Sequence, residues 1–140
     1  MNKVLLGTLV IFLSGCATTV VPPSAAISAP SERIYKFQPE IKNSGKLIVV
    51  RDQGMVGGGC YATIYINGER VAKLDTKEKV NFNLPEGEWA VGTNLEGKGL
   101  CNYSGQRQER YMTIKANETK AVRVFTDGDG NMDIRPTTLN

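Results

Sequence analysis

The chain has 140 residues, of which 41% are hydrophobic and 22% charged, with a formal net charge of +3 and no histidine. This length suits one domain, and the composition is that of a folded protein, because disordered chains carry far fewer hydrophobic residues. The absence of histidine excludes a Ser-His-Asp triad, a histidine-ligated metal and a histidine pH switch. Acidic and basic residues are mixed along the chain, so we expect no nucleic-acid partner, which would require a clustered basic face.

The N-terminus has the layout of an export signal. Lys3 precedes an apolar run over residues 4–13, which is too short to span a bilayer. Residues 13–16 read Leu-Ser-Gly-Cys, which resembles the lipobox of bacterial lipoproteins. The resemblance implies that residues 1–15 are a signal peptide that is removed. It also implies that Cys16 becomes the lipid-modified N-terminus.

Lipid on Cys16 would determine where the protein is held. Each buried CH₂ contributes about 0.8 kcal/mol, so two or three acyl chains give a stable anchor without a membrane-spanning helix. In lipoproteins of Gram-negative bacteria, an aspartate directly after the cysteine tends to retain the protein at the inner membrane. Position 17 is alanine here. The resemblance therefore implies an outer-membrane lipoprotein, and it leaves open whether the domain faces the periplasm or the cell surface.

The stretch after Cys16 indicates a spacer. Residues 17–32 are rich in Pro, Ser, Ala and Thr and show neither helical nor strand periodicity. At about 3.1 Å per residue, this stretch would reach on the order of 50 Å and hold the domain clear of the lipid. Residues 33–45 could begin the fold or continue the spacer. We therefore expect a spacer over residues 16–45 and a domain over residues 46–140.

From residue 46 onward the pattern is that of short strands, beginning with the β-branched run 47–50. Residues 61–66 and 69–74 are strand-like and flank Asn67-Gly68. This is a strong hairpin signal, because both positions of a two-residue turn need positive φ. The turn predicts a register in which Ile64 lies opposite Val71 and Tyr65 lies opposite Arg70.

Later segments predict further strands. Residues 80–84 alternate apolar and polar side chains, and residues 85–87 form a turn into a strand at 89–92 that places Trp89 in the core. Residues 111–114 and 121–125 predict a second hairpin around residues 116–118. About seven short strands separated by turns indicate an all-β fold, a small antiparallel β-sandwich.

Two cysteines remain after Cys16. An even pair in an exported domain favours a disulfide between Cys60 and Cys101, because compartments outside the cytosol are oxidising. The bond would pin two glycine-rich loops, at residues 57–59 and 97–99. The alternative is a reactive thiol pair, although redox pairs usually lie close in sequence, as in C-x-x-C.

Three other features could carry chemistry. Residues 127–133 place oxygen side chains at alternate positions, as in a calcium loop, but lack the turn glycine and the final glutamate, and a hairpin turn also explains them. Arg107, Arg110 and Lys98 form a basic cluster, which either binds an anion or is an exposed strand edge. Tyr103, in the loop with Cys101, is the aromatic side chain that we would mutate first in a partner assay.

The hairpin over residues 64–74 and the Leu-Pro-Glu-Gly turn within residues 82–89 are similar to those of small PEGA-like β domains. A group of short bacterial envelope lipoproteins of uncharacterised function has this layout after a lipobox. The resemblance covers residues 46 to 135 and implies a β-sandwich. It implies no catalytic residues, and the Cys60 and Cys101 pair does not match the general pattern.

These observations favour a non-enzymatic module that binds or organises other components of the bacterial envelope. We expect its partners to be the membrane, through Cys16, and an envelope protein or polymer. The alternative is an accessory subunit of a secretion or conjugation apparatus, or a phage-exclusion or entry-exclusion lipoprotein. No motif identifies a catalytic residue, a cofactor site or a metal site, so we expect none.

Overall fold

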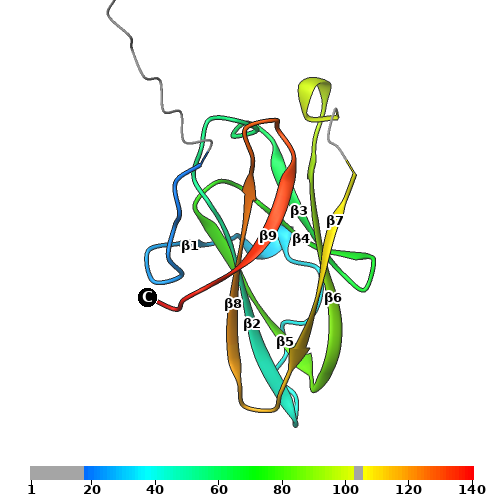
Figure 1. Cartoon of the computed structure of the whole chain (residues 1–140). Coiled ribbons are helices and arrows are strands. Elements are labelled where there is room, and N and C mark those ends of the chain that lie inside the picture. Colours follow the sequence, from blue (N-terminus) through cyan, green and yellow to red (C-terminus); the bar gives the residue numbers. More distant parts are fainter. Residues whose placement is uncertain (1–17, 103–105) are drawn as a thin grey trace, which may run out of the picture.

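The computed structural model describes residues 18–102 and 106–140, which form a β-sandwich (Figure 1). The predicted signal peptide, Cys16 and Tyr103 lie outside the described residues. Two short 3-10 helices are present, η1 (Ser31–Arg33) and η2 (Gly99–Asn102). The strands are β1 (Ile27–Ser28), β2 (Ser44–Arg51), β3 (Tyr61–Ile66), β4 (Glu69–Leu74), β5 (Glu78–Pro85), β6 (Gly87–Glu96), β7 (Gln108–Ile114), β8 (Thr119–Thr126) and β9 (Met132–Thr137).

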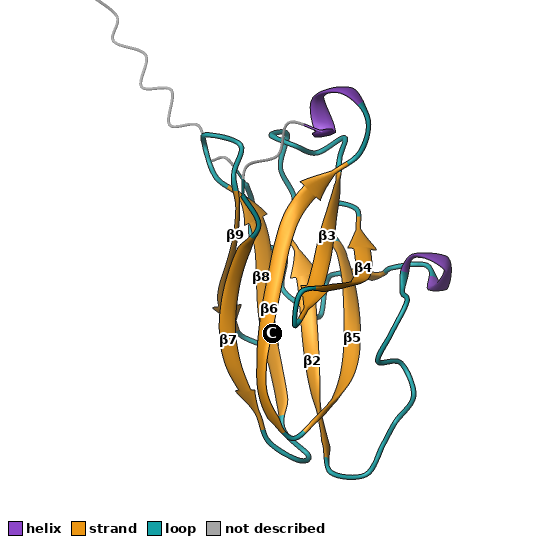
Figure 2. Ribbon diagram, turned by 90° about the vertical axis from the view of Figure 1, so that its right-hand side faces the viewer, coloured by secondary structure: helices purple, strands orange, loops and turns teal. Residues whose placement is uncertain are grey.

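Two sheets pack face to face (Figure 2). One sheet has the strand order β1-β5-β2-β8-β9 and the other has the order β4-β3-β6-β7. The predicted all-β sandwich is confirmed, with nine strands in the described residues instead of about seven. The first sheet is mixed, because β1 pairs parallel to β5 and β2 pairs parallel to β8. The described strands are therefore antiparallel except at these two pairings.

The core lies between the sheets and follows from the alternation of side chains along each strand. On β5, Val80, Phe82 and Leu84 are buried and face the opposite sheet, as the sequence pattern predicts. Full burial of such a side chain contributes about 1.5–3 kcal/mol. The largest fully buried side chains are Phe82, Leu47, Ile64, Ile66, Leu74, Leu84, Ile114, Val49, Val50, Val71, Val80 and Val91.

The predicted hairpin between β3 and β4 is confirmed. Asn67 and Gly68 have φ values of 48° and 81°, and Tyr65 lies opposite Arg70. The predicted pairing of Ile64 with Val71 is wrong, because the register shifts at a β-bulge and Ile64 lies opposite Ala72. The bulge allows two successive residues, Val71 and Ala72, to be buried, which strict alternation forbids.

The second predicted hairpin is wrong. β7 and β8 follow each other through the turn at residues 115–118, but they belong to different sheets. Asn117 N–H donates to the Ser44 carbonyl at 2.9 Å, and Lys46 N–H donates to the Glu118 carbonyl at 2.8 Å. These bonds attach the turn to the start of β2. β8 therefore pairs with β2 in one sheet, while β7 belongs to the other sheet. We call this connection the arch.

The arch crosses β2 at a glycine for a steric reason. A Cβ atom at Gly45 would lie 2.5 Å from Ile114 Cγ2 and 2.5 Å from the carbonyl oxygen of Lys115. Real Cβ atoms do not approach backbone this closely, so a side chain at position 45 would push β2 and the arch apart.

The expectation of a flexible spacer over residues 16–45 is wrong for residues 18–43, which pack against the sandwich. We call these residues the strap. Thr19 forms a β-bridge with Gln53, and β1 adds to the edge of β5. The Arg33 guanidinium forms two hydrogen bonds with the Glu78 carboxylate, at 2.6 and 2.7 Å.

The strap reaches the core at widely spaced residues. Val21 and Ala29 are each 7% exposed. The Phe37 ring packs edge-on against Phe82 and Trp89, with centroids 6.4 and 5.7 Å away. The strap therefore covers the side of the sandwich where β4 and β5 meet. Trp89, which the sequence predicts in the core, is partly buried and packs against the core from its margin.

Replacing Phe37 with alanine tests whether the strap belongs to the fold. We expect Phe37→Ala to lower the free energy of unfolding by about 2 kcal/mol, because the half-buried ring leaves a cavity over Phe82 and Trp89. Urea unfolding of the purified protein measures this change. Tyr35→Ala is the matched control, because that side chain is 48% exposed, and it should change stability by less than about 0.5 kcal/mol. A loss of less than about 0.5 kcal/mol for Phe37→Ala as well would show that the strap is a loose spacer.

Candidate functional site

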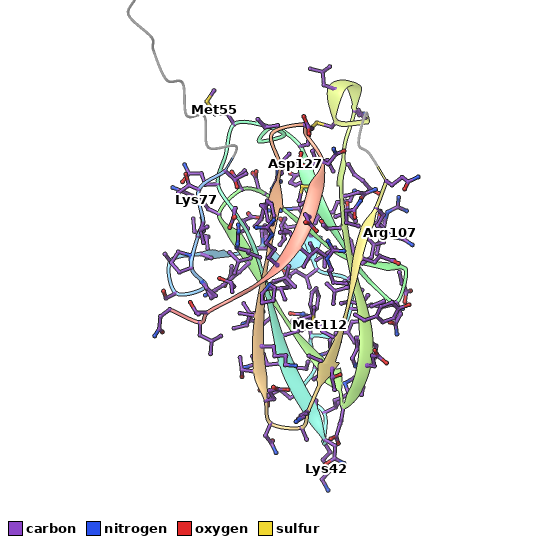
Figure 3. All side chains as sticks on the ribbon, viewed as in Figure 1. Lys42, Met55, Lys77, Arg107, Met112 and Asp127 are labelled. Carbon is purple, nitrogen blue, oxygen red and sulfur yellow. A yellow bond between two sulfur atoms is a disulfide. The ribbon has the colours of Figure 1, made fainter. Side chains whose placement is uncertain are left out.

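The side of the sandwich opposite the strap is open. There the two sheets end in β7 and β9, and a cavity of about 930 Å³ lies between them. Figure 3 shows Met112 of β7 in the space between β7 and β8. Because the arch sends β8 into the other sheet, no backbone strand pairing in the described part of the chain joins β7 to β8 across this space. We call this opening the β7–β9 groove.

The lining of the groove is mainly apolar. Met112, Ile134 and Val122 come from three different strands and also belong to the core or pack against it. Leu139, which follows β9, is 46% exposed at the margin. The apolar and aromatic residues that line the groove are Tyr111, Met112, Ala121, Val122, Ile134, Pro136 and Leu139.

Polar contacts bridge the groove at two places. Arg110 Nη2 lies 2.8 Å from Asp133 Oδ1 and joins β7 to β9. Lys120 Nζ donates to the carbonyl oxygen of Thr113 and joins β8 to β7. Charged residues of the groove lining are three cations, Arg110, Lys120 and Arg135, and one carboxylate, Asp133. The groove lining is therefore apolar with three cations against one carboxylate, and one of these cations, Lys120, also lies 3.8 Å from Glu118 Oε1 outside the lining.

The edge of β7 is open beside this groove. Among the described strands, β6 is the only one that pairs with β7. The bond from Lys120 shows that the Thr113 carbonyl points away from β6. In an antiparallel strand, backbone groups of alternate residues share one direction, so those of Tyr111 and Glu109 also point away from β6. These groups form an edge that an extended chain can join.

Sequence reasoning missed this groove. The alternation of Met132, Ile134 and Pro136 with polar residues was available as a strand signal, and proline favours an edge strand because it cannot donate to a ladder. Nothing local in the sequence indicates that β7 and β8 separate, because the same turn residues suit a hairpin.

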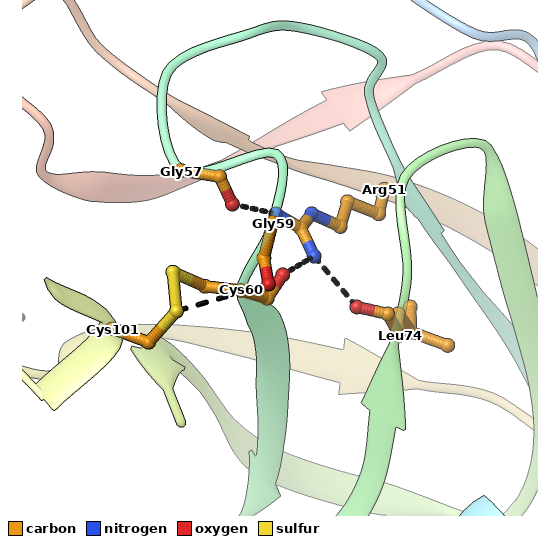
Figure 4. The surroundings of a disulfide bond; sticks show 6 residues. All are labelled: Arg51, Gly57, Gly59, Cys60, Leu74 and Cys101. Atoms are coloured by element: carbon orange, nitrogen blue, oxygen red, sulfur yellow. Dashed lines mark hydrogen bonds between the residues drawn. A yellow bond between two sulfur atoms is a disulfide. The ribbon is translucent and has the colours of Figure 1, made fainter. Parts of the chain in front are cut away.

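A second feature lies at the end of the sandwich where the described chain begins, near Thr19 and Gln53. The Cys60–Cys101 disulfide is formed, with the two Cα atoms 5.3 Å apart, as predicted. Figure 4 shows Arg51 beside it, donating to the carbonyl oxygens of Gly57 and Leu74 at 2.8 Å each and to that of Cys60. Burial lowers the pKa of Arg51 to about 10, and the guanidinium therefore stays protonated at neutral pH. We call residues 54–60 together with η2 the disulfide-linked loops.

Asp52, the residue after Arg51, binds the backbone of the strap. Asp52 is 2% exposed, accepts the Val21 N–H at 3.2 Å and pairs with Arg123. Burial raises the pKa of Asp52, and the bonds from Val21 and Arg123 oppose this shift. The carboxylate is thus a structural acceptor, fully occupied by the strap and β8.

The predicted basic cluster is split by ion pairs. Arg107 Nε lies 3.0 Å from Glu109 Oε1 and stacks over the Tyr65 ring, while Arg110 pairs with Asp133. On the same outer face of the four-stranded sheet, the Tyr65 hydroxyl donates to Glu96 Oε1 at 2.6 Å. Burial would raise the pKa of Glu96, but the bonds from Arg70 and Tyr65 outweigh it and hold the pKa at about 2. These arginines are neutralised by carboxylates and do not form an anion site.

Residues 127–131 form the turn between β8 and β9, and Met132 and Asp133 already belong to β9. Asp127 Oδ1 accepts the N–H groups of Asp129 and Asn131 at 2.9 Å each. The remaining carboxylate at the end of the stretch, Asp133, pairs with Arg110. The hairpin-turn interpretation is confirmed, and two of the oxygens that a calcium ion would need are used within the fold.

The described residues contain neither a cluster of metal ligands nor a helix suited to cross a membrane. No group of three or more His, Cys, Asp or Glu side chains within them could hold a metal ion. No helix in residues 18–102 or 106–140 has the length and hydropathy needed to cross a membrane. No protein-family model matches the sequence, and no curated protein has a significantly similar one.

Removing the disulfide tests its contribution to stability. The two cysteines are 41 residues apart, and the loop-closure entropy of such a cross-link corresponds to about 4 kcal/mol. We expect the Cys60→Ala, Cys101→Ala double variant to unfold at lower urea concentration, with a loss of about 2–4 kcal/mol. Thiol titration of the exported wild-type protein is the companion measurement. Reaction of both thiols without reductant would contradict the bond.

Proposed function

We propose that the protein is a lipid-anchored binding module of the bacterial envelope, and that it captures an extended segment of a protein partner in the β7–β9 groove. The observation that carries the proposal is the open edge of β7 beside an apolar groove of about 930 Å³. A partner strand would add to this edge through main-chain hydrogen bonds, and alternate side chains of that strand would enter the groove.

The chemistry of the groove defines the partner segment. Its floor is apolar, so the inward side chains of the partner would be apolar. Lys120 and Arg135 place positive charge at the rim, so acidic side chains beside the apolar ones would complement it. We therefore expect an extended segment that combines apolar and acidic residues, and we expect binding to weaken as salt concentration rises.

The anchor belongs to the same proposal. The sequence around Cys16 resembles a lipobox, and Ala17 in the next position favours delivery to the outer membrane. A lipid anchor confines the domain to a membrane surface, and this raises the effective concentration of the groove toward partners held at that surface. An anchored accessory subunit of an envelope apparatus would use the groove in the same way.

Lipid labelling tests the anchor. In a Gram-negative host grown with an alkyne analogue of palmitate, we expect the wild-type chain to take up the label and to fractionate with the outer membrane. Cys16→Ser should take up none, because the acylated thiol is absent. The Cys60→Ala, Cys101→Ala variant is the matched control and should be labelled like wild type. Labelling of Cys16→Ser would contradict lipidation at that residue.

Photo-crosslinking tests the groove. A photoreactive amino acid at Tyr111, which is 74% exposed on β7, should crosslink to one envelope protein in cells. The same amino acid at Tyr35, which is 48% exposed on the strap, should not capture that protein. Identification of the crosslinked peptide should give an extended segment that contains apolar and acidic residues.

Glu109→Pro provides the second arm of this experiment. The N–H of Glu109 points away from β6. Proline at this position therefore removes one hydrogen-bond donor from the open edge of β7, while the pairing of β6 with β7 remains. We expect the crosslink from Tyr111 to fall by at least about fivefold, as expected for loss of about 1 kcal/mol in binding, with thermal unfolding unchanged. Equal capture at Tyr111 and Tyr35, or an unchanged crosslink in Glu109→Pro, would contradict binding at the edge of β7.

A further inference from the structure

Two large apolar side chains are almost fully exposed at one end of the sandwich. Met55 is 97% exposed and Leu100 is 94% exposed, and Val56 beside Met55 is 39% exposed. They lie on the disulfide-linked loops, at the end of the molecule where the described chain begins (Figures 1 and 3). Large apolar side chains that share one end of a molecule suit contact with an apolar environment, provided that a second observation places that environment there.

The strap places the start of the described chain at these loops. Thr19 N–H donates to the Gln53 carbonyl at 2.5 Å, and Gln53 N–H donates back at 3.0 Å, two residues before Met55. Thr18 and Thr19 line the same hollow as Met55 and Val56. Two residues span at most about 7 Å, so Cys16 is held within that distance of Thr18. A spacer over residues 17–45 would have allowed a far greater separation.

We propose that the disulfide-linked loops rest on the lipid bilayer, with Met55 and Leu100 inserted among the headgroups and upper acyl chains. The proposal rests on lipidation of Cys16, which is part of the proposed function. With the lipid at Cys16 and so short a connection to the fold, the end of the sandwich that carries Met55 is the one that meets the membrane.

The loops suit this contact because they are held in place before it forms. The Cys60–Cys101 disulfide joins the two loops, and Arg51 fixes the carbonyls of Gly57 and Cys60. Insertion therefore orders little additional chain, which would otherwise oppose it. Lys98 and Asp129, which are exposed in the loop before η2 and in the β8–β9 turn, carry opposite charges. The contact would thus depend on apolar burial and not on anionic lipid.

The proposed orientation on the bilayer determines the direction in which the β7–β9 groove opens. Lys42 lies at the opposite end of the sandwich, and Met112 lies between the two ends (Figure 3). With the disulfide-linked loops on the bilayer, the β7–β9 groove would open sideways, above the lipid surface, where a partner strand can reach it.

Tryptophan quenching by brominated lipid tests the contact. The full chain, processed by a Gram-negative host and purified from its membranes, is reconstituted into phosphatidylcholine vesicles with or without dibrominated acyl chains. In Met55→Trp and Leu100→Trp, we expect the fluorescence added by the new tryptophan to fall by about half in brominated vesicles, because interfacial side chains reach the depth of the bromines. The matched control is Lys42→Trp, an exposed position at the far end, which should show no added quenching. Trp89, the one native tryptophan, gives the background.

The outcomes separate this inference from the anchor. Vesicle flotation of the wild-type chain is measured first, and a chain that does not float overturns lipid anchoring together with the contact proposed here. A chain that floats, but in which Met55→Trp and Leu100→Trp are quenched no more than Lys42→Trp, retains the anchor and overturns the contact alone. Quenching that disappears at high salt would also overturn it, because apolar burial does not weaken with salt.

Discussion

The buried guanidinium of Arg51 is the contact on which the entry end of the sandwich depends. It stands at the end of β2, almost without solvent exposure, and satisfies three carbonyl oxygens, from Gly57, Cys60 and Leu74. A charge buried this deeply is tolerated only when its donors are occupied, so the positions of these carbonyls are fixed as a set. The next residue, Asp52, points the other way and holds Val21 of the strap. Two successive side chains thus fix both the disulfide-linked loops and the start of the strap.

The two long sides of the sandwich differ because the chain covers only one of them. The strap closes the side of β4 and β5 with hydrogen bonds, the Arg33–Glu78 ion pair and the Phe37 ring. The arch leaves the other side open. It carries β8 to β2, so that among the described strands β7 pairs only with β6. The groove and the open edge of β7 therefore both result from the arch. A protein that uses an edge strand for binding must keep that edge uncovered, and on the opposite side of the sandwich the strap pairs with β5 and β4.

The strap also changes how the proposed lipid anchor would relate to the domain. A flexible spacer would let the sandwich move freely above the membrane, whereas a chain bridged to Gln53 from Thr19 onward leaves little freedom. Exposed Met55 and Leu100 at the same end then have a physical reason to remain exposed. On this proposal, the lipid anchor and the disulfide-linked loops would lie at the membrane surface, and the β7–β9 groove would lie farther from it.

The sequence alone determined the features that depend on neighbouring residues. Asn67-Gly68 specified its hairpin through positive φ, alternation at residues 80–84 specified a buried face, and an even cysteine pair specified the disulfide. Tertiary structure alone decided the rest. The turn at residues 115–118 suits a hairpin or an arch equally, and hydrogen bonds to the start of β2 select the arch. The strap lacks periodicity because isolated residues such as Val21 and Phe37 reach the core at irregular intervals, and only the presence of two sheets gives them a place to pack. Local patterns encode local geometry, but pairing between distant segments depends on surfaces that exist only once the chain has folded.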